Sequence, residues 1–441
     1  MSLRQSIHSA CRQQTTFTAA MIPLLIVGVT ASQAPSAVSG SLTLAQAIEM
    51  ALQNHPRIRS AERLAAAGTA AVAAARAPYF PTFSLNVTSV GAQPDGAVAA
   101  GALTTSSLAN RLAGGVIASQ LLTDFGRTSA LVATATRRAA GHERQVDDVR
   151  ARVRLEVAET YYEALGARAV LTVAQADLET RRILLRQVDA LAKNELKSTL
   201  DVSFASVAVL EAELAVARAE GVVQSAAAKL AAAMGSLNIS AYELVDEPLP
   251  EPLEPNLDTL IDEATRRRPD LAATRLDRDA ALEFATAERR LSLPSINVQA
   301  LAGGVPTHDR RLQGGYSAVG INVNLPLLTG GLFTARRTDA SFRAQAVAED
   351  LKDLTIAVAR DVRIAWVEAD NAFKRLALTT RLVEQAEKTL RLAEARYNLG
   401  LTSIVEINQA QLSNTSAQIN AARSRYEYLA RRAALDHAIG R

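Results

Sequence analysis

Residues 319–325 read Val-Gly-Ile-Asn-Val-Asn-Leu, and the alternation of large apolar with small or polar residues in this stretch decides the fold. A period of two predicts a β-strand that has one apolar and one polar face. After Gly330-Gly331 the period becomes that of a helix, and no proline interrupts residues 333–397. At 1.5 Å per residue such a helix reaches about 100 Å, which is longer than a compact domain can bury.

The same order of elements occurs earlier in the chain, so the sequence contains an internal repeat. The segment Leu196-Lys197-Ser198 corresponds to Leu401-Thr402-Ser403, 205 residues later. Nearer the start of each half, His55-Pro56-Arg57-Ile58 corresponds to Arg268-Pro269-Asp270-Leu271, 213 residues later. Because length differences collect in exposed loops, this change of offset predicts a loop between the two strands of each half.

These patterns predict a mainly α-helical fold with a small β part, built from two tandem repeats of helix, β-hairpin and long helical hairpin. The first repeat is expected over 41–235, with strands at about 82–91 and 112–123 and the long hairpin at about 127–235. The second is expected over 258–441, with strands at about 295–303 and 316–327 and the long hairpin at about 333–438. A proline-rich connector, residues 236–257, separates them.

The composition excludes several classes of function. Lys and Arg number 48 against 45 Asp and Glu, and a formal charge of +3 is too small for a nucleic-acid surface based on bulk positive potential. The single cysteine, Cys11, excludes a disulfide scaffold and a thiolate zinc cluster. His55, His142, His308 and His437 are scattered, and no nucleophile, base and orienting acid can be assembled. We therefore predict no metal, no cofactor and no enzyme activity.

The first 40 residues have the order of a secretory signal peptide. Arg4 and Arg12 make a basic start, residues 19–29 form a short apolar run, and small residues predominate over 31–37. We expect residues 1–40 to be a signal peptide that is removed on export.

A strand with one aliphatic face and one face of Asn, Gln, Ser and Thr has two possible settings. One is an antiparallel sheet half-exposed on a soluble core, and the other is a membrane barrel with lipid outside and a wet lumen inside. Four strands are too few to close a barrel, for which about eight is the minimum, so a barrel would pool strands between subunits. Aromatic side chains gather at the strand ends, where they suit either an interfacial girdle or a plug at the strand-to-helix junction. They are Tyr79, Phe80, Phe83, Phe125 and Phe333.

Three short motifs follow one another along the chain and are the most specific features of the sequence. They are Ala77-Pro78-Tyr79-Phe80-Pro81, Thr123-Asp124-Phe125-Gly126-Arg127 and Arg396-Tyr397-Asn398-Leu399-Gly400-Leu401-Thr402. With them the chain after residue 41 resembles the TolC family of outer-membrane efflux proteins. The resemblance implies a homotrimer in which each subunit gives four strands to one 12-stranded β-barrel, set in the outer-membrane lipid of a Gram-negative bacterium and continued by an α-helical barrel through the periplasm. It also implies a passive exit duct of a tripartite efflux pump or a type I secretion system. The implied partners are a periplasmic adaptor (membrane fusion protein) and an inner-membrane transporter.

The resemblance also implies a pore constriction just after the turns of the long hairpins. The matching residues are Asp201, Glu406 and Gln409, each of which three-fold symmetry would turn into a ring that sets ion selectivity. Gln409 stands where an acid is usual, so the constriction should be less negative. Tyr397 matches a gate-latch position, whereas Thr402 replaces a basic latch residue.

The two acids have a second interpretation that needs no pore. Ser198 with Asp201 and Ser403 with Glu406 both fit the S-x-x-[DE] pattern of a capping box at a helix start. Capping and gating both remain open at this point, and one side chain can do both.

The turns themselves are the adaptor contacts that the resemblance implies, namely Leu196, Lys197, Ser198, Gly400, Leu401 and Thr402. The alternative function is a periplasmic adaptor or coiled-coil scaffold protein of an export complex, whose long hairpin only bridges partners. An adaptor would carry a compact β domain beside one hairpin, whereas this chain repeats both the hairpin and the strands.

Overall fold

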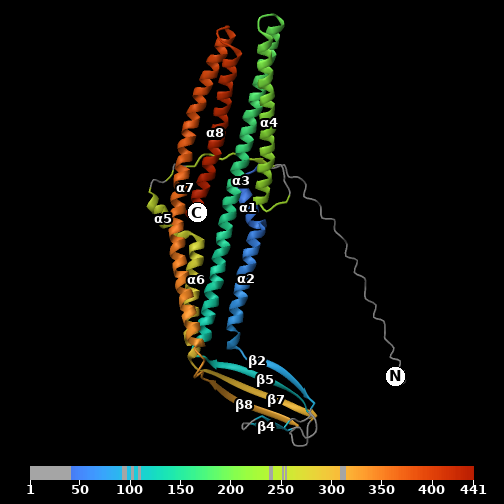
Figure 1. Cartoon of the computed structure of the whole chain (residues 1–441), viewed down its shortest axis with the longest axis vertical. Coiled ribbons are helices and arrows are strands. Elements are labelled where there is room, and N and C mark those ends of the chain that lie inside the picture. Colours follow the sequence, from blue (N-terminus) through green and yellow to red (C-terminus); the bar gives the residue numbers. More distant parts are fainter. Residues whose placement is uncertain are drawn as a thin grey trace, which may run out of the picture. The chain divides into compact units, whose positions relative to one another are not determined.

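The computed structural model describes residues 41–91, 97–100, 104–107, 111–237, 242–250, 253, 256–307 and 314–441. The expected signal peptide lies outside these residues, as do parts of both interstrand loops and of the connector. The described chain is mainly helical with a small sheet, in agreement with the prediction (Figure 1).

The helices occur in pairs of equal length. The two long hairpins are α3 (Arg127–Lys193) with α4 (Thr199–Ala233), and α7 (Leu332–Asn398) with α8 (Ile404–Ala438); α3 and α7 have 67 residues each, and α4 and α8 have 35 each. The shorter helices are α1 (Leu44–Asn54), α2 (Pro56–Arg76), α5 (Leu257–Arg267) and α6 (Pro269–Arg289).

Local sequence explains where these helices break. Pro56 and Pro269 occupy the first position of α2 and α6, where the missing amide proton costs nothing, and each preceding residue is extended. Gly126 and Gly331 precede α3 and α7 with φ of 89° and 83°, a backbone conformation that only glycine adopts without strain.

Four antiparallel strands form the main sheet in the order β2-β5-β7-β8. They are β2 (Thr82–Val90), β5 (Arg111–Thr123), β7 (Ser295–Thr307) and β8 (Gly315–Asn324). β8 ends three residues before the expected limit, because Leu325 precedes Pro326, which has no amide to donate to the ladder. A small hairpin of β3 (Ala97–Ala100) and β4 (Thr104–Ser107) lies within the first interstrand loop and was not expected.

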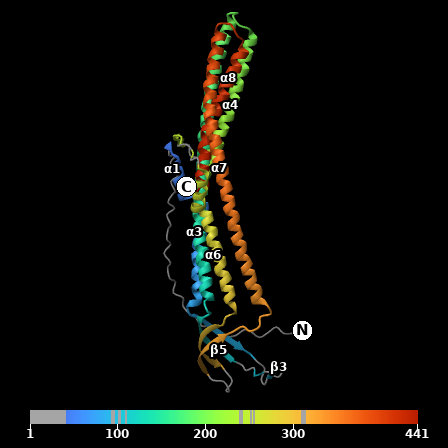
Figure 2. The same cartoon turned by 90° about the vertical axis from the view of Figure 1, so that its left-hand side faces the viewer.

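α3 is the central helix, and it packs against α2, α4, α6 and α8 (Figures 1 and 2). Its fully buried Tyr161 fastens two distant segments to it, β1 (Ser41–Leu42) and β6 (Glu243–Leu244), which pair in parallel. The Tyr161 hydroxyl lies 2.7 Å from the carbonyl oxygens of Leu42 and Val245 and accepts a hydrogen bond from the Val245 amide. Burial raises the pKa of Tyr161 to about 12, so the hydroxyl remains a donor at ordinary pH.

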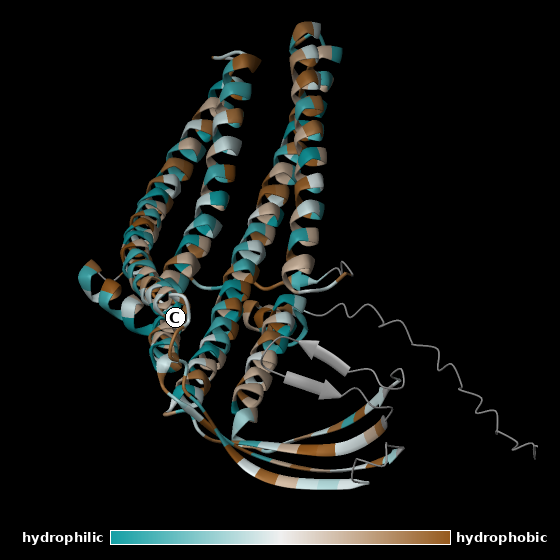
Figure 3. Ribbon diagram, turned by 60° about the horizontal axis from the view of Figure 1, so that its bottom comes forward, coloured by the Kyte–Doolittle hydropathy of each residue, from teal (hydrophilic) through white to brown (hydrophobic). Residues whose placement is uncertain are grey.

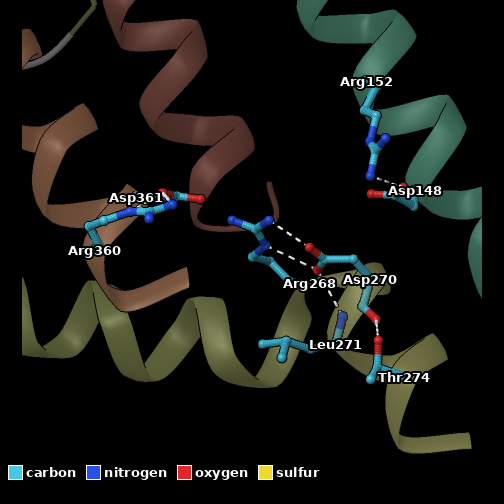
Figure 4. Close-up of polar contacts among 8 residues, drawn as sticks. All are labelled: Asp148, Arg152, Arg268, Asp270, Leu271, Thr274, Arg360 and Asp361. Carbon is cyan, nitrogen blue, oxygen red and sulfur yellow. Dashed lines mark hydrogen bonds and ion pairs between the residues drawn. The ribbon is translucent and has the colours of Figure 1, made fainter. Parts of the chain in front are cut away.

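A charged network lies where α5 gives way to α6, close to α3 (Figure 4). Arg268 forms two hydrogen bonds of 3.1 and 2.6 Å to the Asp270 carboxylate, and both side chains are largely buried. Burial works to raise the pKa of Asp270, but the hydrogen bonds and charge of Arg268 lower it overall. On α3, Asp148 pairs with Arg152 at 2.7 Å, and burial raises the pKa of Asp148. Asp270 is paired with Arg268, which directly precedes α6, and Asp148 is paired with Arg152 of α3. Because each acid already has a cation as partner, we assign this network a structural role.

Candidate functional site

The turns of the two long hairpins collect most of the residues that the sequence marked. The first tip is residues 194–198 and the second tip is residues 399–403, each five residues between two helices. Glu195 and Gly400 occupy corresponding places and both have positive φ, 59° and 74°. The first tip therefore places a glutamate in a backbone conformation that the second tip gives to glycine.

Asp201 caps the helix that it begins. Its carboxylate accepts a 3.3 Å hydrogen bond from the Ser198 amide, while the Ser198 hydroxyl accepts one of 3.1 Å from the Leu200 amide. This is the reciprocal capping box that the sequence pattern predicted for the first tip.

Glu406 does not cap, although its sequence pattern is the same. The Ser403 side chain makes no capping hydrogen bond to α8. Instead the Glu406 carboxylate accepts a hydrogen bond from the Thr402 hydroxyl and lies 3.4 Å from the Arg396 guanidinium. The expectation of a second capping box was wrong, because a hydroxyl and a cation within reach compete for the carboxylate.

Tyr397 lies in a small apolar core between the two hairpins, which we call the tip cluster. Its buried members are Leu184, Val188, Tyr397, Ile404 and Ile407. The Lys197 ammonium lies 4.2 Å from the centre of the Tyr397 ring, a cation–π contact from the first tip to the end of α7. Burial and the charge of Asp201 raise the pKa of Tyr397, and its buried hydroxyl has no hydrogen-bond partner among the described residues.

The remaining marked residues of the tips are at or near the surface. Leu196 of the first tip is 69% exposed, and Leu401 of the second tip is 66% exposed beside Leu399 at 73%. Ser198, Gly400 and Gln409 are exposed, whereas Lys197 and Thr402 are half-buried. Gln409 lies three residues after Glu406 on α8, so the two side chains are neighbours on the surface of that helix.

The strand register sorts the sheet into two faces, because directly opposed residues share a face. We call one the apolar face; it carries Phe83, Leu85, Val87, Val116, Ala118, Val298, Ala300, Val319, Ile321 and Val323. The other is the polar face, with Thr82, Ser84, Asn86, Thr88, Ser119, Asn297, Gln299 and Asn322, and it also carries a short apolar row of Ile117, Leu301 and Ala318. Figure 3 shows hydrophobic residues (brown) interspersed with paler, less hydrophobic ones along the strands.

The apolar face is uncovered in the single chain. Leu85 is 72% exposed and Val319 is 78% exposed, and every residue of β8 is exposed. The sheet also has two open edges, since neither β2 nor β8 has a second neighbour among the described strands.

The marked aromatic residues differ in their exposure. Tyr79, Phe80, Phe83 and Phe125 are exposed. Phe333 is half-buried and lines a cavity of about 510 Å³ between the strand ends and the helices, together with Arg290. Only Phe333 therefore acts as a junction plug within the single chain.

Comparison with known proteins decides the family. The model of a family described as outer membrane efflux protein matches residues 47–236 and 260–441. The chain belongs to the outer membrane efflux protein family. Membership agrees with the TolC-like resemblance, and the protein is accordingly an outer-membrane protein.

Two curated relatives of this efflux family are similar in sequence. Nodulation protein T of Rhizobium leguminosarum bv. trifolii is 27% identical over 282 residues, which cover 59% of this chain and 59% of that protein. Outer membrane protein TolC of Salmonella enteritidis is 24% identical over 313 residues, which cover 65% of this chain and 60% of TolC. The chain thus spans about 60% of the length of these relatives.

A solved member shows that the fold is shared. The crystal structure of the outer membrane protein VceC of Vibrio cholerae superposes with a TM-score of 0.76 at 21% identity, over 90% of this chain and 96% of that chain. No helix in the described ranges is long and apolar enough to cross a membrane. The part of the chain that the structure describes also contains no group of three or more His, Cys, Asp or Glu residues placed to hold a metal.

Two contacts of this family member were missed by sequence reasoning. Arg396 lies in a motif that was singled out, but nothing in the sequence paired it with Glu406. Lys197 was expected only at an adaptor contact, and its position on Tyr397 joins residues 200 positions apart. The single sequence carries no signal for either contact.

Proposed function

We propose that the protein is the passive outer-membrane exit duct of a tripartite efflux pump or a type I secretion system. The observation that carries the proposal is the sheet, which has an uncovered apolar face, a polar opposite face and two open edges. A soluble protein gains nothing from such a surface, because exposed apolar strands with open edges promote aggregation.

Lipid and further copies of the chain satisfy all three features of the sheet at once. Lipid covers the apolar face, and pairing of β8 with β2 of another copy closes the edges. Three copies supply twelve strands, comfortably above the roughly eight that a closed barrel needs. We propose this homotrimer, with the repeats 41–235 and 258–441 each contributing one strand pair per copy.

The long hairpins then form the duct below the barrel. A helix of 67 residues is about 100 Å long, and it joins a strand at one end to a hairpin tip at the other. Exposed apolar residues on the hairpins would be covered by neighbouring copies in a closed ring of helices. Examples are Leu210, Leu214, Ile356 and Val367.

The tips form the gate in this proposal. Tyr397 acts as the latch by holding the end of α7 against the first hairpin through the tip cluster and Lys197. Rings of Asp201, Glu406 and Gln409 set selectivity, and the Asp201 carboxylate, bound to a neutral backbone amide, keeps its full charge, whereas Arg396 partly offsets that of Glu406. The exposed Leu196 and Leu401, with Lys197, Ser198, Gly400 and Thr402, offer the surface for a periplasmic adaptor, which connects the duct to an inner-membrane transporter.

Ion selectivity in planar bilayers tests the proposal. Under a KCl gradient the purified protein should give a cation-selective reversal potential, and Asp201→Asn and Glu406→Gln should each move that potential toward zero, because each removes one negative charge per subunit from the constriction. Glu349→Gln, which removes an exposed carboxylate of α7 paired with Lys352, is the matched control.

The outcomes separate the gate from the duct. Absence of any channel current from correctly folded protein would overturn the proposed duct. Channels whose selectivity is unchanged by Asp201→Asn or by Glu406→Gln would leave the duct intact and remove that carboxylate from the constriction.

A further inference from the structure

Tyr316 occupies an unusual place in the sheet. The four main strands contain two aromatic residues, Phe83 and Tyr316. Phe83 pairs with Ala118 on the apolar face, whereas Tyr316 pairs with Gly303 on the polar face. Its nearest neighbours on that face are glycine or apolar, namely Gly303, Gly115, Ala318 and Leu301, and the Asn and Gln side chains of β7 and β8 lie further along the strands.

The Tyr316 side chain extends across its neighbours in the sheet. A Cβ built on Gly303 would stand 2.5 Å from ring carbon Cζ, and a Cβ built on Gly115 would meet the Tyr316 hydroxyl. Gly303 pairs with Gly115 in turn, so the ring starts on β8, crosses β7 and reaches β5. Two glycines at a cross-strand pair make a seat that any side chain would block.

One side of the ring is thus packed on glycine backbone, and the side chain as a whole is still 42% exposed. This exposure leaves part of the ring accessible to solutes. The face of a phenol ring carries negative potential and attracts cations, and it also stacks with flat aromatic groups.

We propose that Tyr316 is a recognition site for organic cations, above all aromatic ones, on the wall of the lumen. The proposal rests on the proposed function, since only the closed trimer turns the polar face into a lumen. Three copies place three such rings at one level of the barrel. The glycine seat keeps each ring against the wall, so the site binds passing solutes without narrowing the duct.

Block of the channel current by benzyltrimethylammonium, added on the side of the interstrand loops, tests this inference. The concentration for half block should rise about threefold to fivefold in Tyr316→Leu, the loss expected for one exposed cation–π contact. Tyr316→Phe keeps the ring, so benzyltrimethylammonium should block this variant at the same concentration as the unchanged protein. Asn322→Leu, on the same strand and face, is the matched control and should also leave the block unchanged.

A purely structural role of Tyr316 as cover for the glycines gives a different pattern. In that case Tyr316→Leu and Tyr316→Met, which both refill the seat, would be blocked as strongly as the unchanged protein, and the inference would be overturned. If Tyr316→Leu fails to assemble, Tyr316→Met takes its place with the same expected loss. A protein that conducts no current would refute the proposed duct instead, so the two failures are distinguishable.

Discussion

The two hairpin tips have the same length and corresponding residues, yet their carboxylates do different things. Asp201 closes a capping box with Ser198 at the first tip. Glu406, 205 residues later, leaves Ser403 unused and binds Thr402 and Arg396 instead. The positions that correspond to Thr402 and Arg396 at the first tip are Lys197 and Leu191, so neither alternative partner exists there.

The difference teaches that a duplicated motif need not keep its role. Two residue differences near the carboxylate accompany the change in what it binds, because a cation and a hydroxyl within reach are strong partners for a carboxylate. At the first tip Lys197 contacts Tyr397 of the other hairpin instead. Position 192, which corresponds to Tyr397, is an alanine, so the latch is built on one side only.

Removing the latch should have the largest effect on this comparison. Tyr397→Ala leaves a cavity among Leu184, Val188, Ile404 and Ile407 and should cost about 3–5 kcal/mol of local stability. We expect faster hydrogen exchange at both tips and a larger single-channel conductance. Unchanged exchange and conductance would show that the tip cluster does not hold the hairpins together.

Tyr397→Phe is the matched control for the latch. The Tyr397 hydroxyl is buried without a partner among the described residues, so its loss should leave conductance unchanged and should not lower stability. A clear gain in conductance for Tyr397→Phe would mean that the hydroxyl finds a partner in the assembled protein.

The turn backbone gives the next largest effect. Gly400→Ala places a side chain at φ 74° and should destabilise the second tip by about 1–2 kcal/mol. Glu195→Gly relieves the same strain at the first tip and should stabilise it by less than about 1 kcal/mol, since glycine also gains entropy in the unfolded chain. Hydrogen exchange of the turn amides measures both, and equal signs for the two variants would contradict the account.

The caps should give the smallest effect and the sharpest contrast. Ser198→Ala removes the hydroxyl that accepts from the Leu200 amide and should cost about 1 kcal/mol of stability at the start of α4. Ser403→Ala should change the start of α8 by less than about 0.5 kcal/mol, because Ser403 makes no side-chain cap. Hydrogen-exchange rates in the first turns of α4 and α8 measure the two losses of stability. Equal losses for Ser198→Ala and Ser403→Ala would contradict the account.

Much of the fold could be predicted from the sequence because its signals are local. Period-two alternation marked the strands, and the lack of proline marked α3 and α7. Pro56 and Pro269 marked the helix breaks. The β3–β4 hairpin was missed because its Ala, Ser and Thr residues have no alternation to detect.

The candidate site was less predictable, since its contacts depend on tertiary structure. The S-x-x-[DE] pattern could not tell Asp201 from Glu406, because the difference lies in Arg396 on another helix. The seat of Tyr316 likewise requires the pairing of three strands that are far apart in the chain.

Cysteine cross-linking between β2 and β8 tests most directly whether copies of the chain share one barrel. Within one chain β5 and β7 separate these strands by about 14 Å, three strand spacings, which is beyond the reach of a disulfide. We predict that Leu85→Cys combined in turn with Cys at positions 319, 321 and 323 gives, at one position, a disulfide-linked trimer in membranes. If every pair stays monomeric under oxidation while the protein is folded and in the outer membrane, the shared barrel is refuted.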